Sequence, residues 1–98
     1  MNKELTNIYE ALKQHDETLS QRRLSKDYLG RSEAYLFSNN YYGRDISKGA
    51  AVSLYNNLKS MADTWGELYE ETPRERFKQY QVLYGDLAQK AQRLALAE

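Results

Sequence analysis

The chain has 98 residues, with 14 acidic and 14 basic side chains and no cysteine, which fits one domain over residues 1–98 without disulfides or thiolate metal sites. Its zero net charge argues against a strongly basic protein that coats nucleic acids without sequence preference. No apolar run approaches the ~18 residues that span a bilayer, and the acidic first residues are unlike a signal peptide, so we expect a soluble, cytoplasmic protein.

The start of the chain predicts the first helix. Its apolar residues recur with helical spacing and are Leu5, Ile8, Tyr9 and Leu12. We expect this helix over residues 2–15, with its apolar face on the core and its charged face in water.

Two short helices joined by a glycine are predicted next. Ser25 is a suitable N-cap for the first of them, which should end at Gly30. Glycine readily adopts the left-handed conformation that turns the chain sharply. Ser32 is a suitable N-cap for the next helix, which should fade over residues 39–42 and stop at Gly43.

The last half of the chain predicts two long helices. Ser47 caps the first, which should extend to about residue 69, and Pro73 starts the second with Thr72 as its cap. The second helix carries a coiled-coil-like seam at Phe77, Tyr80, Tyr84, Leu87, Ala91 and Leu94. This seam can close on a helix of the same chain or on a second copy, so a homodimer through these helices is an open alternative.

These patterns together predict an all-α fold of about five helices, with a helix-turn-helix over residues 22–43 and a helical hairpin over residues 47–95. In a helix-turn-helix, a short helix braces a second one, whose first residues enter the major groove of DNA. We expect Tyr35 and Leu36 to pack inward. The residues expected to face outward are Ser32, Glu33, Ala34, Phe37, Ser38 and Tyr41.

Charge is unevenly distributed along the chain. Residues 20–48 contain six basic side chains and three acidic ones, whereas residues 1–19 contain two basic and four acidic ones. The basic excess therefore coincides with the predicted helix-turn-helix, where contacts to phosphate would be needed. An ordinary mixed surface is the alternative interpretation.

A longer pattern runs through the middle of the chain: a glycine, a serine-capped helix, a loop with glycine and arginine, and an apolar helix. It is carried by Gly30, Arg31-Ser32, Leu36, Gly43-Arg44, Ile46-Ser47, Leu54 and Leu58. This run from Gly30 to Leu58 resembles the lambda-repressor-like (Cro-type) helix-turn-helix domains, which usually have proline at the position of Ile46.

Three departures from that family stand out, and the first is Arg31, because the residue after the glycine is usually apolar. The family has an apolar-then-alanine step before the turn, where this chain has Ser25 and Lys26, unless Leu24 and Tyr28 supply the brace instead. Asn39 stands where the family has a buried aliphatic residue. A buried amide there would cost a few kcal/mol unless it is hydrogen-bonded.

The resemblance implies specific DNA contacts. Ser32, Glu33 and Phe37 would face bases, with Ser38 beside the groove; Glu33 can accept from a cytosine amino group and Phe37 can contact a thymine methyl. The implied phosphate contacts are Arg22, Arg23, Lys26, Arg31, Arg44 and Lys48. Alternatively, Glu33 only stabilises the start of its helix through the macrodipole.

No catalytic group, metal site or cofactor is predicted. His15 is the only histidine, and the carboxylates around residues 67–71 suit a solvated turn. We therefore expect a non-enzymatic bacterial or phage transcriptional regulator that binds double-stranded DNA, with two copies on a palindromic site. The alternative is a helical protein-interaction module, such as an adaptor or a phage-type inhibitor, which the zero net charge and outward aromatic residues favour.

Overall fold

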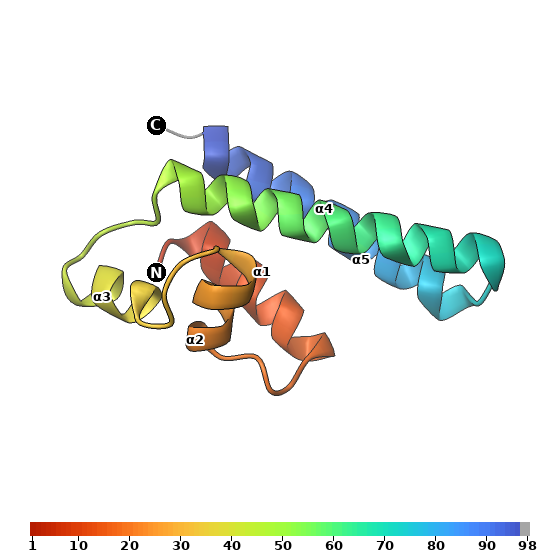
Figure 1. Cartoon of the computed structure of the whole chain (residues 1–98), viewed down its shortest axis with the longest axis horizontal. Helices are drawn as coiled ribbons and strands as arrows, with labels where there is room; N and C mark the ends of the chain where they lie inside the picture. Colours follow the sequence, from red (N-terminus) through yellow and green to blue (C-terminus); the bar gives the residue numbers. More distant parts are fainter. Residues whose placement is uncertain (97–98) are drawn as a thin grey trace.

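The computed structural model describes residues 1–96, and all regular elements in that range are helical. The elements are α1 (Lys3–His15), α2 (Gln21–Arg23), a π-helical turn η1 (Leu24–Tyr28), α3 (Tyr35–Tyr41), α4 (Lys48–Glu71) and α5 (Glu75–Leu96). Helices α4 and α5 form a long hairpin, while α1, α2 and α3 lie along one side of it (Figure 1). The predicted all-α class and the C-terminal helical hairpin are confirmed.

The core lies between the hairpin and α1. The largest buried side chains of these helices are Leu5, Ile8, Leu12, Leu54, Leu58 and Leu87. On α5, the seam position Ala91 is fully buried, and small residues there let α4 approach closely. Since α5 packs mainly on α4 and also touches α1, the seam closes within the chain.

The start of α1 follows the prediction. The side chain of Asn2 accepts hydrogen bonds from the backbone N–H groups of Glu4 at 2.8 Å and Leu5 at 3.3 Å. These bonds satisfy two of the donors that every helix leaves free at its first turn. The helix then ends at His15, as its apolar spacing indicates.

The prediction of Ser25 as an N-cap is wrong. The second helical segment begins earlier, at Gln21, where the Ser20 hydroxyl accepts from the Arg23 N–H at 3.2 Å. The segment continues through η1, where the Leu29 N–H donates to the Leu24 carbonyl five residues back, at 3.0 Å. This wider turn contains one residue more than an α-helical turn. Leu24 and Leu29, at its two ends, are both fully buried.

The third helix is shorter than predicted. Gly30 has φ of 65° and Gly43 has φ of 66°, which confirms the two turns. Ser32, however, is not an N-cap: its carbonyl accepts from the Tyr35 N–H at 3.1 Å in a turn, and α3 begins only at Tyr35. The helix therefore covers residues 35–41 rather than 32–42.

The hairpin ends differ in one respect from the prediction. The Ser47 hydroxyl accepts from the Ala50 N–H at 3.1 Å, which confirms the cap of α4. Thr72 closes α4 instead of starting α5, because Pro73 forces the preceding residue into an extended conformation. Helix α5 then begins at Glu75, two residues after the proline.

Within residues 1–96, every helix is too short or too polar to cross a membrane.

Candidate nucleic-acid interface

Helix α3 lies at one end of the molecule, outside the cover of the hairpin (Figure 1). Its inner face is formed by Leu36 and Asn39, which are both buried. Its outer face exposes 72% of Phe37 and 75% of Tyr41. Leu36 therefore packs inward, and Phe37 and Tyr41 face outward, as predicted; Tyr35 is only partly buried.

Ser25 joins α3 to the preceding helix. Its hydroxyl donates to the Gln21 carbonyl at 2.8 Å and accepts from the Leu36 N–H at 3.2 Å. Leu24 and Ser25 are both fully buried, whereas Lys26 is exposed. The apolar-then-small step beneath α3 is thus Leu24–Ser25, one residue earlier than the alignment with Lys26 implied.

Asn39 is a buried polar residue of α3, and its amide is hydrogen-bonded. Its side-chain amide donates to the Asp45 carbonyl at 3.4 Å, and its own carbonyl accepts from the Arg44 N–H at 2.7 Å. A buried amide with such partners avoids most of the desolvation penalty. These two bonds also hold the loop that leads from α3 to α4.

Tyr35 anchors the other end of that loop. Its hydroxyl accepts from the Ser47 N–H at 2.8 Å, and the Arg31 guanidinium reaches the Ser47 hydroxyl at 3.4 Å. Partial burial raises the pKa of the Tyr35 hydroxyl, but the hydrogen bonds with Ser47 outweigh it and leave the pKa below its usual value. Arg31 therefore helps to connect the turn after Gly30 to the start of α4.

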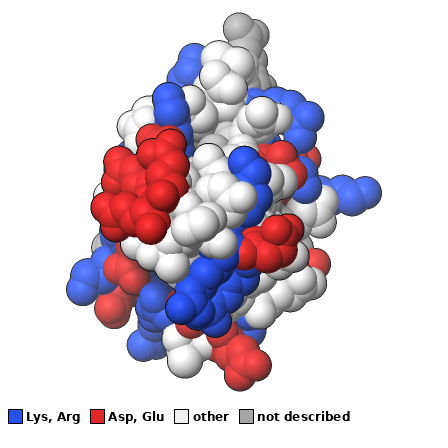
Figure 2. All heavy atoms as spheres, turned by 90° about the vertical axis from the view of Figure 1, so that its right-hand side faces the viewer, with Lys and Arg blue, Asp and Glu red and all other residues white. Residues whose placement is uncertain are grey.

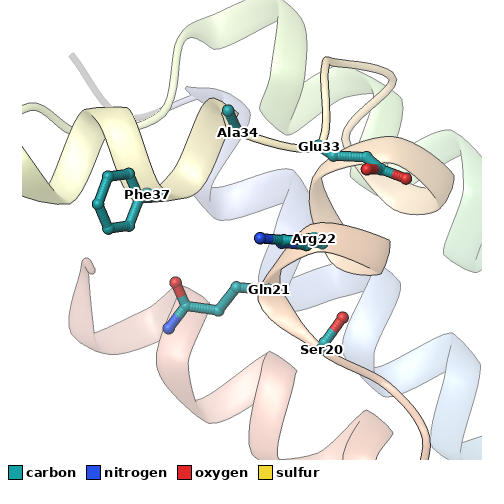
Figure 3. Close-up of a pocket in the computed structure, with 6 residues that line it drawn as sticks. All are labelled: Ser20, Gln21, Arg22, Glu33, Ala34 and Phe37. Carbon is teal, nitrogen blue, oxygen red and sulfur yellow. The ribbon is translucent and has the colours of Figure 1, made fainter.

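An open groove of about 600 Å³ lies between the starts of α2 and α3. It is lined by Ser20, Gln21, Arg22, Glu33, Ala34 and Phe37. Figure 3 shows the Arg22 side chain extending across the middle of this groove, with its guanidinium directed toward the Phe37 side and Glu33 on the opposite side. We call this site the α2–α3 groove.

Arg23 lies outside the α2–α3 groove. Its guanidinium bonds to Asp16 at 2.9 Å, to the Thr18 hydroxyl at 2.8 Å and to Asp27 at 3.4 Å. The hydrogen bond from Thr18, followed by that from Arg23, lowers the pKa of the Asp16 carboxyl. In this arrangement Arg23 ties the α1–α2 loop together, and its charge is already compensated.

The remaining residues of the predicted interface surround α3. Arg44 stacks over the Tyr42 ring, with 4.8 Å between the guanidinium carbon and the ring centroid. Ser38 is partly buried on α3, beside a shallow hollow formed with Phe37 and the two tyrosines. Lys26, Ser32, Arg44 and Lys48 are all exposed.

A family model described as "Family of unknown function (DUF6626)" matches residues 5–97. The chain belongs to this family. The matched range contains the α2–α3 groove and both helices of the hairpin. The family model therefore covers nearly all of the helical fold. No curated protein and no solved structure matches the chain.

The opposite end of this DUF6626 chain has a different electrostatic character. Figure 2 looks onto the hairpin end, where acidic and basic side chains form separate patches. In the sequence, residues 63–71 carry four carboxylates and no lysine or arginine, whereas residues 74–78 carry three basic side chains and one acidic one. This end therefore offers no continuous basic surface for DNA.

Three residues that line the α2–α3 groove were not predicted as interface residues: Ser20, Gln21 and Ala34, of which only Ala34 was expected to face outward. The sequence did contain a signal for Ser20 and Gln21, because a serine before a helical run that contains leucine is a common start of a helix. His15, in contrast, makes an edge-on contact with Tyr80, with 5.3 Å between ring centroids. Within residues 1–96, no cluster of three or more potential metal ligands occurs.

Proposed function

We propose that this chain is a small DNA-binding regulator that places the start of α3 in the major groove of duplex DNA. The observation that carries the proposal is the exposure of the outer face of α3 beside Arg22, at an end of the molecule that the hairpin leaves open. A reading helix needs this combination of a packed inner face and an accessible outer one.

The packing beneath α3 supports the resemblance to lambda-repressor-like domains. Leu24 and Ser25 provide the apolar-then-small step, and Ser25 bonds directly to the backbone of Leu36. Asn39, at the position of a buried aliphatic, has hydrogen-bond partners in the following loop. These two departures, at the step beneath α3 and at Asn39, are therefore compatible with a braced reading helix.

The distribution of charge supports contacts to phosphate around this helix. Arg22, Lys26, Arg44 and Lys48 are exposed, and none of them forms an ion pair within residues 1–96. Basic side chains in this state can replace the counterions of DNA, which makes binding depend on salt. Arg23 contributes less, because Asp16 and Asp27 already compensate its charge.

A polarisation titration on labelled random-sequence duplex DNA tests the proposal. We expect binding that weakens steeply between 50 and 200 mM salt, as in other proteins that make several phosphate contacts. Arg22→Ala combined with Arg44→Ala should weaken binding, with a fall in the salt slope of about one for the lost phosphate contact of Arg44. Absence of binding at low salt, or binding insensitive to salt, would overturn the proposal.

The matched control for that variant removes two arginines from the other end of the molecule. Arg74→Ala combined with Arg76→Ala makes the same change in net charge at the start of α5. We expect DNA affinity and salt slope to remain near the wild-type values. An equal loss of DNA affinity in both double variants would mean that binding depends only on the net charge of the protein.

Two copies are proposed to bind a palindromic site through the ends of the hairpin nearest α3. Val52, near the start of α4, and Leu96, at the end of α5, are exposed apolar residues. The start of α4 and the end of α5 lie on the side of the hairpin nearest α3 (Figure 1). A contact between the distant hairpin tips would place the two α3 helices too far apart, since the molecule is 46 Å long and half-sites lie about 34 Å apart. Sedimentation of Val52→Lys should show loss of the dimer.

A protein-interaction module is the second candidate. It is favoured by the aromatic surface of α3, where Tyr42 is 63% exposed beside the more exposed Phe37 and Tyr41. Exposed aromatic residues that lie together often mark a binding surface for protein. The titration distinguishes the two candidates, because only the DNA-binding one requires Arg22 and a salt-dependent affinity for duplex DNA.

A further inference from the structure

The α2–α3 groove places a guanidinium beside an aromatic ring. Arg22 comes from α2 and Phe37 from α3, and both line the same open groove. Figure 3 shows the Arg22 guanidinium pointing toward the Phe37 side. No hydrogen bond or ion pair within residues 1–96 engages that guanidinium, so its donors are available to a ligand.

Each of these groups matches a feature of the major groove. A guanidinium can donate two parallel hydrogen bonds to O6 and N7 of guanine. An apolar ring suits the C5 methyl group of a pyrimidine, which projects into the same groove. Because the two side chains lie together, they can contact neighbouring bases at the same time.

The negative charge of Glu33 favours base edges over the phosphate backbone as the DNA groups that enter the α2–α3 groove. Its carboxylate lines the groove on the other side of Arg22 from Phe37 (Figure 3). A carboxylate at this place repels phosphate, whereas it can accept a hydrogen bond from the amino group of a cytosine. Ala34 adds a small apolar surface to the same wall.

We infer that Arg22 and Phe37 together read a two-base step, consisting of a guanine and an adjacent pyrimidine that carries a C5 methyl group. The inference rests on the proposed function and assigns Arg22 to a base instead of a phosphate. Thymine and 5-methylcytosine both present this methyl group, and the experiment distinguishes them.

The first experiment identifies a preferred site and then changes single atoms in it. A site is selected from a random duplex library, and deoxyuridine then replaces each thymine in turn. At one position next to a guanine, loss of the methyl group should weaken binding about fourfold, the effect of exposing one buried methyl. In a second arm, cytosine and 5-methylcytosine are compared at that position.

The second arm assigns the source of the methyl group. If the protein reads 5-methylcytosine, methylation of cytosine should tighten binding about fourfold, and the methylated duplex should bind at least as well as the thymine duplex. If it reads thymine, the cytosine duplexes should bind more weakly with or without the methyl. Either result supports the inference once deoxyuridine has weakened binding in the first arm, because that loss requires a methyl-dependent contact.

Variants then assign the contacts to the two side chains. Phe37→Ala should bind the thymine and deoxyuridine duplexes equally, because the methyl group loses its partner. Arg22→Ala removes the donors altogether, so replacing the adjacent guanine with 7-deazaguanine should no longer matter. In the wild type, that replacement should weaken binding about tenfold.

Tyr42→Ala is the matched control, because it removes an exposed aromatic residue just beyond α3 and outside the α2–α3 groove. It should preserve the sensitivity to both modified bases. Salt-dependent DNA binding without any methyl effect would overturn this inference and leave the proposed function intact. Absence of DNA binding would overturn both. A methyl effect that persists in Phe37→Ala would remove Phe37 from the reading surface.

Discussion

The hydroxyl of Ser25 accepts a hydrogen bond from the backbone N–H of Leu36 at 3.2 Å, which joins α3 to the helix that supports it. Both residues are buried. The hydroxyl simultaneously donates to the Gln21 carbonyl, so one small side chain connects two helices.

Ser25→Ala should therefore destabilise the fold. The Leu36 N–H would remain buried without its partner, which costs about 1–3 kcal/mol in the free energy of unfolding. Urea denaturation measures this change. Thr64→Ala is the control, since its hydroxyl makes the same type of helix-backbone bond on the surface and should change stability by less than about 0.5 kcal/mol. Equal effects would mean that the Leu36 bond contributes nothing.

Gly30→Ala tests the turn before α3. A side chain at φ of 65° is strained, with a cost of about 1–2 kcal/mol, and its Cβ would also lie 3.2 Å from the Ser53 hydroxyl. At Gly43, φ is 66° and an added Cβ would have no neighbour within 4 Å. Gly43→Ala should therefore lower the free energy of unfolding only through the strained backbone conformation. Thermal unfolding should rank Gly30→Ala as the less stable. Adding Ser53→Ala should recover the difference between them.

Gly85→Ala should stabilise the hairpin. Gly85 is helical, and a Cβ added there meets no atom within 4 Å. Replacing glycine with alanine inside a helix raises the free energy of unfolding by about 1 kcal/mol. Gly66→Ala is the contrasting case, because its Cβ would lie 2.7 Å from the Gln81 amide and that side chain must move. A larger gain from Gly66→Ala than from Gly85→Ala would contradict the prediction.

Asp16 should make stability depend on pH in the acid range. Its pKa is lowered from the usual value of 3.8 by Thr18 and Arg23. A carboxylate with a lowered pKa stabilises the fold above its unfolded pKa, and this contribution is lost as pH falls through the folded pKa. The stability difference between wild type and Asp16→Asn should therefore be largest above about pH 5 and shrink toward lower pH.

Glu17→Gln is the control for that measurement. It removes a neighbouring negative charge without touching the Thr18 or Arg23 bonds of Asp16. Denaturation curves collected across the acid range compare the two variants. A difference between wild type and Asp16→Asn that stays constant over this range would show that the negative charge of Asp16 does not stabilise the fold.

The fold could be predicted where local chemistry decides it. Ser47 caps α4 through a bond to a residue three positions away, and Gly30 and Gly43 turn the chain at positive φ. Such features depend on a few neighbouring residues. The sequence therefore indicates them directly.

Long-range packing explains most of the errors. Serine is a residue type typical of N-caps, but Ser25 lies within the wide turn of η1 and is buried in the core. The pairing of Arg23 with Asp16 spans the α1–α2 loop and leaves no periodic signal in the sequence. Arg22 and Phe37 were each assigned to the interface, but their proximity results only from the packing of α2 against α3.

The two positive-φ glycines enclose α3, a seven-residue helix that packs mainly against α2. An isolated helix of this length is not stable in water, so α3 depends on its packing against α2 and on its bonds to Ser25 and to the following loop. We expect its amide protons to exchange with solvent much faster than those in the buried middle of α4. A ligand in the α2–α3 groove would slow this exchange, which makes deuterium uptake by α3 a direct measure of occupancy.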